Sequence, residues 1–91
     1  MNLGQTIKMI RMEKGISQKE LAQKSGLSGN ALCSIEKDKS FPCKDTINSI
    51  CKALNISAGF LLFASLTEDD IPKEKLPIFR ALHEPIMKLF L

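Results

Sequence analysis

The sequence predicts an all-α protein, and three observations lead to this prediction. Apolar residues recur at spacings of three and four along most of the chain, whereas the alternation that is typical of strands is absent. Serine precedes several of these segments, and glycine, asparagine or proline follows them, as at the starts and ends of helices. The chain has 91 residues, of which 44% are hydrophobic and 25% charged, and this balance fits one small folded unit with a single core.

The first of five expected helices covers about residues 3–14. Leu3, Ile7 and Ile10 are spaced by four and three residues, so their side chains share one face of this helix. Gly15 suits the left-handed position that commonly ends a helix. The pattern therefore predicts an amphipathic helix that packs on a core.

The second and third helices follow with only a short link between them. Ser17 begins the second helix and forms a capping-box pattern with Glu20, and Gly26 ends it. Ser28 caps the third helix, which runs to about Glu36. A link of only about three residues makes the two helices cross steeply, as in a helix-turn-helix.

Such a crossing restricts the residue types at several positions of the pair. Ala22 must be small, because the following helix passes close to it, and Gly26 must accept a left-handed backbone. Leu32 and Ile35 must be apolar, because they hold the pair against the core. The sequence meets each of these requirements.

A polar loop over residues 37–42 ends in Pro42 and leads to the fourth helix, over about residues 44–54. Asn55 is expected to end this helix, and the fifth begins after Ser57. One face of the fourth helix is apolar, and it consists of Ile47, Ile50, Cys51 and Leu54.

The last part of the chain divides into a connector and an apolar tail. Residues 67–75 are charged and contain Pro72, which is typical of a connecting segment. The tail is expected to be helical, with Pro77 in its first turn and a kink or a restart at Pro85. We therefore expect a domain over residues 1–66, followed by a connector and a helical segment over residues 67–91.

The charge of the chain is unevenly distributed. The net charge is +3, and residues 1–60 carry nine basic and five acidic residues, which gives them +4. Residues 61–91 carry four basic and five acidic residues and are slightly negative. A basic excess in one module is the electrostatic pattern that favours a phosphate backbone as partner, although many surfaces share it.

Other classes of function are disfavoured by composition. The spacing of Cys33, Cys43 and Cys51 matches no zinc pattern, and His83 is the only histidine, so we expect no metal, no cofactor and reduced thiols. The absence of Trp and Tyr speaks against a stacking platform for single-stranded nucleic acid. We find no nucleophile–base pair that would indicate an enzyme, and no signal peptide or spanning segment. We therefore expect a cytoplasmic protein that does not bind a membrane.

The joint pattern resembles the phage repressor and Cro helix-turn-helix family, which is also called XRE-like. The resemblance covers about residues 3–63. Its motifs are Arg11-x-x-x-Gly15, Ser17-Gln18-x-Glu20-Leu21-Ala22, Gly26-Leu27-Ser28, Ile35-Glu36 and the closing Pro42…Ile47…Ile50…Leu54-x-Ile56-Ser57. The resemblance implies a five-helix domain whose third helix enters the major groove of double-stranded DNA.

The resemblance also implies roles for individual residues. Three positions of the third helix would face base edges, namely Gly29, Asn30 and Ser34. A second group would contact phosphate, namely Gln18, Lys37, Lys39, Ser40 and Lys44. Arg11 and Glu36 would form a structural ion pair between the first and third helices. Cys43 stands where the family usually has serine, and cysteine is a poorer helix cap.

One helix-turn-helix contacts few base pairs, so we expect a homodimer that holds two of them on a symmetric operator. The apolar residues that exceed the needs of one small core would form the interface, namely Phe60, Phe63, Leu66, Phe79, Leu82, Ile86 and Phe90. The expected function is that of a transcriptional regulator, most simply a repressor that occludes polymerase, and the sequence leaves open activation by contact with polymerase through the second helix. Two alternatives remain open. The tail either folds back on its own domain, or binds another protein and makes the chain an antitoxin or anti-activator.

Overall fold

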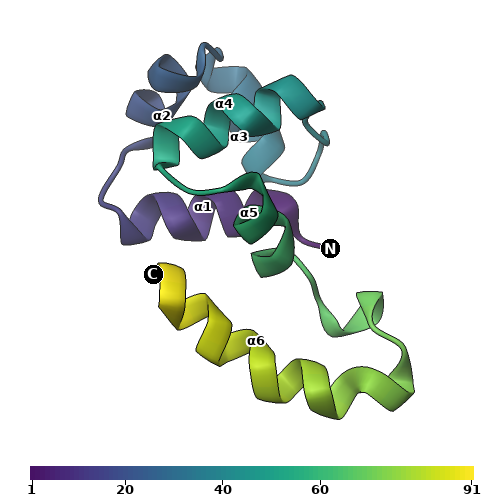
Figure 1. Ribbon diagram of the computed structural model, residues 1–91. Helices are drawn as coiled ribbons and strands as arrows, with labels where there is room; N and C mark the ends of the chain where they lie inside the picture. The colour runs from purple at the N-terminus through teal and green to yellow at the C-terminus, as the bar shows by residue number, and fades with distance from the viewer.

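The computed structural model describes all 91 residues and contains helices and turns but no strand, which confirms the predicted all-α class. The first five helices form a compact group, and the sixth lies below this group in Figure 1. The helices are α1 (Leu3–Glu13), α2 (Gln18–Ser25), α3 (Gly29–Glu36), α4 (Lys44–Leu54), α5 (Ala58–Ala64) and α6 (Leu76–Phe90). Two single turns of 3-10 helix, Glu68–Asp70 and Lys73–Lys75, lie in the connector before α6.

The predicted helix starts and ends are confirmed by local hydrogen bonds and backbone angles. Three serines each accept a hydrogen bond of 3.0 Å from the backbone N–H three residues later, and they are Ser17, Ser28 and Ser57. Three residues after helices adopt positive φ angles between 58° and 70°, and they are Gly15, Gly26 and Asn55. The capping box at α2 is only half formed, because the Glu20 carboxylate pairs with Lys24 at 3.1 Å instead.

The core is enclosed by the five helices α1 to α5. It contains thirteen buried residues, and these are Leu3, Ile7, Ile10, Leu21, Ala22, Leu32, Ile35, Ile50, Cys51, Leu54, Phe60, Leu61 and Ala64. The apolar faces expected for the first and fourth helices are thus directed inward, except that Ile47 is only partly buried. No single helix is long and apolar enough to cross a membrane, and α4 with α5 reaches that length only as a pair bent by 97°.

A close contact between α1 and the end of α3 was not anticipated from the sequence. The Gly4 backbone N–H donates a hydrogen bond of 2.8 Å to Oδ1 of Asp38, which follows α3 with a φ of 58°. A Cβ atom on Gly4 would collide with the carbonyl oxygen of Ile35. Glycine is therefore required at this position by the approach of two backbones, and not by its own φ angle.

Replacing Gly4 by alanine is expected to lower the free energy of unfolding by about 1–3 kcal/mol. The added methyl group would force the backbone carbonyl of Ile35 to move away from α1. Thermal and urea unfolding would measure the change. The matched control is Gly59→Ala, since a Cβ at Gly59 meets nothing within 4 Å. The control should keep or slightly raise stability through its helix propensity. Equal stability of the Gly4 and Gly59 variants would contradict the close contact.

The α6 helix packs on the bundle mainly through aromatic side chains of α5. The rings of Phe60 and Phe90 stack with centroids 4.4 Å apart, and Phe63 lies 5.1 Å from the His83 ring. None of the fifteen residues of α6 is buried. Its C-terminal end turns toward α1 (Figure 1), and the side chain of Met87 packs against the core.

The connector fixes the start of α6 by surface contacts. Arg80 of α6 binds Glu68 through two hydrogen bonds of 2.7 and 2.9 Å, and these bonds lower the pKa of the Glu68 carboxyl. Pro77 lies in the first turn of α6, as predicted. Of the kink or restart predicted at Pro85, the restart does not occur, because one helix continues through this residue. Pro85 removes one backbone hydrogen bond, and its exposed position lets the helix tolerate the loss.

Candidate nucleic-acid interface

The candidate interface is built on α2 and α3. The left-handed Gly26 turns the chain, and the backbone N–H of Leu27 bonds the carbonyl of Ala22 at 2.9 Å, which closes the end of α2. Ala22 is 3% exposed, and Leu32 and Ile35 are buried in the same core. The four residues predicted to form the turn and its packing thus lie where the crossing of the two helices needs them.

The first turn of α3 is open to solvent. Gly29 and Asn30 are exposed, and the amide of Asn30 forms no hydrogen bond within the chain. A Cβ on Gly29 would meet nothing within 4 Å, so packing does not require glycine there. Ser34 is half-buried, and its hydroxyl lies 3.4 Å from that of Ser40. The helix therefore presents one free amide beside an unfilled position.

A shallow hollow separates α2 from α3 at this surface. Its apolar lining includes Ala22 and Leu27. The polar residues around it are Gln18, Lys19, Gln23 and Asn30. Because Gly29 contributes no side chain, the hollow stays open at the start of α3.

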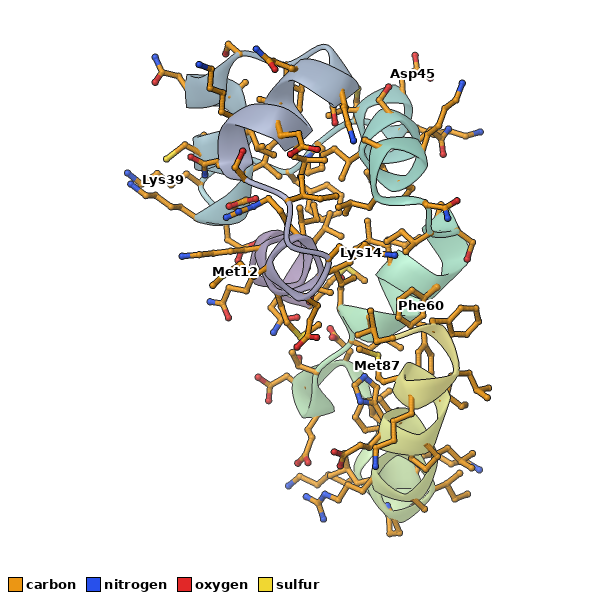
Figure 2. The ribbon with its side chains drawn as sticks, turned by 90° about the vertical axis from the view of Figure 1, so that its left-hand side faces the viewer. Met12, Lys14, Lys39, Asp45, Phe60 and Met87 are labelled. Carbon is orange, nitrogen blue, oxygen red and sulfur yellow. The ribbon has the colours of Figure 1, made fainter.

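Cationic side chains surround the end of α3. Lys37, Lys39 and Lys44 are exposed, and none of them forms an ion pair, whereas Lys24 on α2 does. In Figure 2, Lys39 points into solvent on the side of the bundle away from Met87. Together with the exposed Ser40, these lysines are the phosphate contacts predicted after α3, in a segment that also contains Asp38 and Asp45.

The start of α4 differs from the other capped helices. The Cys43 thiol caps no backbone N–H, in agreement with the poor capping expected of cysteine. Its sulfur lies 3.3 Å from the Thr46 hydroxyl, and hydrogen bonding from this side chain lowers the pKa of the exposed thiol. The thiol of Cys51, by contrast, is part of the core, where burial raises its pKa.

Arg11 and Glu36 form the ion pair between α1 and α3. The guanidinium donates two hydrogen bonds to the carboxylate, 2.8 Å from Nε to Oε2 and 3.1 Å from Nη2 to Oε1. A third bond of 3.0 Å joins Nη1 to the carbonyl of Ile16, before α2. Arg11 is 9% exposed and Glu36 is 4% exposed, so the pair is shielded from water.

Gln18 is hydrogen-bonded to the Arg11–Glu36 pair, and the sequence did not indicate this contact. Its Nε2 donates a hydrogen bond of 3.1 Å to Oε1 of Glu36, so the side chain is held and does not extend freely into solvent. The separation of eighteen residues between the two partners explains why local pattern could not reveal the bond. The backbone N–H groups of Gln18 and Lys19 have no acceptor within the chain.

The residues predicted to form a dimer interface differ in accessibility. Phe60 is 4% exposed and belongs to the core of its own domain, so its assignment to an interface is corrected. Four others are half-buried, namely Phe63, Leu66, Phe79 and Ile86. Leu82 and Phe90 remain about half exposed, although Phe90 stacks on Phe60. The tail thus folds back in part while it leaves apolar side chains in solvent.

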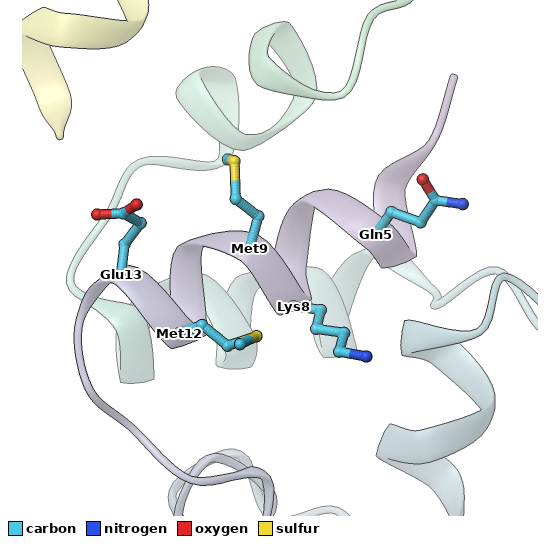
Figure 3. Close-up of a pocket in the computed structure, with 5 residues that line it drawn as sticks. All are labelled: Gln5, Lys8, Met9, Met12 and Glu13. Atoms are coloured by element: carbon cyan, nitrogen blue, oxygen red, sulfur yellow. The ribbon is translucent and has the colours of Figure 1, made fainter.

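A further surface hollow, on α1, was not expected. Figure 3 shows Met9 on one side of this helix and Met12 with Lys8 on the other. Met9 and Met12 are exposed, and Gln5 and Glu13 complete the lining. The hollow is shallow and involves none of the residues that the sequence assigned to a role.

Comparisons with known proteins agree with this geometry. Residues 7–61 match the helix-turn-helix family. The chain is 36% identical over 75 residues to the immunity repressor protein of Bacillus phage phi105, covering 82% of this chain and 49% of the relative. It is 36% identical over 62 residues to the HTH-type transcriptional regulator ImmR of Bacillus subtilis, covering 68% and 49%. The chain thus spans about half the length of these relatives.

A solved structure has the same arrangement of helices. The clp gene regulator ClgR from Corynebacterium glutamicum superimposes with a TM-score of 0.69, over 97% of this chain and 85% of that one. The sequence identity is 23%, so this similarity concerns the fold. It extends past α5, since 97% of the chain includes α6.

Proposed function

This chain belongs to the helix-turn-helix family, and from that premise we propose that it represses transcription by binding a two-fold symmetric DNA site as a homodimer. The relatives named above are a repressor and a transcriptional regulator, which favours this function over that of an antitoxin or anti-activator. One observation carries the proposal. The first turn of α3 presents an unbonded Asn30 amide, and the exposed lysines that follow the helix, Lys37, Lys39 and Lys44, form no ion pair.

Base recognition falls to the exposed face of α3. An asparagine amide can bind N6 and N7 of adenine with two hydrogen bonds, and Asn30 is free to do so. Ser34 is less selective, because a hydroxyl both donates and accepts. Gly29 adds no base contact of its own and allows the backbone of α3 to approach the groove.

Phosphate binding falls to two places on either side of α3. The free backbone N–H groups at the start of α2, with Gln18, suit one phosphate, because a helix N-terminus attracts anions. The second place is the segment after α3, where phosphates of the other strand or the neighbouring phosphates would be bound by Lys37, Lys39, Ser40 and Lys44. These contacts supply affinity and orientation, while sequence preference comes from α3.

We assign dimerisation to α6, because part of its apolar surface is not covered by the rest of the chain. Ile78, Leu82 and Leu89 are 56%, 51% and 77% exposed. Their positions along α6 place them on one stripe, which borders the face that meets α5, because Ile78 and Leu82 line the same groove as Phe63 and Leu66. Successive major grooves on one face of DNA lie roughly 34 Å apart, and we propose that a two-fold pairing of this stripe joins two reading helices to span that distance.

A lysine in place of Leu82 is expected to lower the dimer population at least roughly tenfold, because a charge would replace an apolar contact at the centre of the interface. Sedimentation equilibrium across a range of protein concentrations would measure it. Ala81→Lys is the matched control, since Ala81 is also exposed on α6 but lies outside the stripe. The same mass per particle in both variants and in the wild type would contradict this interface.

Replacing Asn30 by alanine is expected to relax base preference at one position of each half-site, by about 1–3 kcal/mol of discrimination. Affinity for random duplex should stay unchanged. A panel of single-base variants of the best site, titrated with both proteins, would measure the effect. The assignment of Asn30 fails if its removal lowers affinity equally for every base at every position.

The function itself is tested by selecting fragments of bacterial DNA with the purified protein. The selected fragment and a random duplex are then titrated at several salt concentrations. We expect enrichment of a symmetric site with an affinity at least ~10³-fold above that for random duplex, and a steep salt dependence of both. Equal and weak binding to both duplexes would overturn the proposal and point to a protein partner of the tail.

A further inference from the structure

We infer that Glu36 is a positioning residue for DNA binding, because it orients the Gln18 amide so that an N–H group faces a DNA phosphate. The inference rests on the phosphate contact of Gln18 proposed above and adds what sets its geometry. The Arg11–Glu36 pair on its own would only join α1 to α3. The bond from Gln18 to the same carboxylate extends the pair to the start of α2.

The carboxylate of Glu36 decides which way the amide points. A carboxylate only accepts hydrogen bonds, so it must face the nitrogen of Gln18 and not its oxygen. The reversed amide would place its oxygen against Oε1 of Glu36, and the two acceptors would repel each other. One N–H of the amide is thus used by Glu36, and the second remains for another acceptor.

Arg11 keeps Glu36 in place and makes its charge tolerable near DNA. Two hydrogen bonds from the guanidinium reach the two carboxylate oxygens, which fixes the plane of the carboxylate. The positive charge of Arg11 offsets the negative charge of Glu36, which would otherwise repel a phosphate. Glu36 can therefore hold Gln18 close to an anion without weakening its binding.

The orientation adds one donor to two that have no acceptor within the chain. The backbone N–H groups of Gln18 and Lys19 are unbonded, whereas that of Glu20 is taken by the Ser17 hydroxyl. With the free N–H of the amide, the start of α2 offers three donors, which suits the two non-bridging oxygens of one backbone phosphate, because each of these oxygens can accept more than one hydrogen bond. Glu36 thus prepares the site before DNA arrives, and binding need not order a free glutamine side chain.

A double-mutant cycle separates this role from a structural one. Affinity for the selected operator is measured for the wild type, Gln18→Ala, Glu36→Gln and the double variant, at a temperature where circular dichroism shows all four folded. We expect Glu36→Gln to lower affinity roughly threefold to tenfold when Gln18 is present, and less than twofold when it is absent. An equal loss in both backgrounds would overturn the inference, because a structural role does not depend on Gln18.

A duplex with a neutral methylphosphonate at the contacted phosphate gives a second test. The substitution should weaken the wild type and leave the Gln18→Ala and Glu36→Gln variants closer to their values for the normal duplex. If Gln18→Ala binds DNA as well as the wild type, the proposed phosphate contact fails, and this inference with it. If Gln18→Ala binds weakly but the cycle is additive, only the role of Glu36 fails.

The wild-type protein provides a measurement that does not depend on the folding of a variant. Side-chain ¹⁵N relaxation reports how rigid each glutamine amide is. Gln18 should be more ordered than Gln23, which is exposed on the same helix and forms no hydrogen bond. Equal mobility of the two amides in the DNA-free protein would contradict the positioning by Glu36.

Discussion

Removing Lys37, Lys39 and Lys44 together by alanine substitution should weaken binding to specific and random duplexes alike, by roughly 10²-fold at 100 mM salt. All three lysines are exposed and lack acidic partners, so each can neutralise one phosphate and release its counterions. The slope of log affinity against log salt concentration should fall by up to about 2.7, since each lost phosphate contact contributes about 0.9. Fluorescence anisotropy between 50 and 200 mM salt would measure both quantities.

The control for this variant removes the same charge elsewhere. Lys52, Lys73 and Lys75 are exposed residues on α4 and the connector, away from the segment between α3 and α4. Their replacement by alanine should change affinity only slightly. If the two triple variants lose affinity to the same extent, net charge and not the position of the lysines determines binding.

Replacing Arg11 by methionine should lower the free energy of unfolding by about 3–5 kcal/mol, because it leaves the buried Glu36 carboxylate without its cation. Urea unfolding followed by circular dichroism would measure the loss. Replacing Arg11 and Glu36 together by apolar residues should restore much of the stability, since no uncompensated charge then remains.

The chain contains a matched pair for this experiment. Arg80 binds Glu68 with two hydrogen bonds of similar length, but both side chains are more than half exposed. Exposed pairs contribute little to stability, because water screens them. Arg80→Met should therefore leave stability nearly unchanged, and a loss as large as that of Arg11→Met would show that burial is not the cause.

Local features of the fold could be predicted from the sequence. A serine cap or a left-handed glycine acts within a few residues, so Ser17, Ser28 and Gly26 revealed their helix ends directly. The apolar face of α1 was visible for the same reason, because it repeats with the period of the helix. The helix-turn-helix pair followed from these local rules and from the short link.

Contacts between distant segments could not be predicted in this way. The residues around Gly4 do not indicate that its backbone N–H binds Asp38, which lies 34 residues later in the chain. The bond between Gln18 and Glu36 depends on how α2 sits against α3, and side-chain periodicity says nothing of it. Phe60 was assigned to an interface because the segment that contains it has more apolar residues than a small core needs. Which of these residues are buried in the core depends on how the helices pack, and Phe60 is one of them.

The contrast between α6 and the bundle has a consequence for how long the protein survives in a cell. Because α6 contributes no buried residue, its local unfolding costs less free energy than unfolding of the five-helix unit. Its opening exposes Phe60 at the edge of the core and frees a charged, proline-containing connector, a kind of segment that proteases cleave readily. Anything that covers α6 would therefore also slow degradation, so the abundance of the regulator would depend on its state of assembly.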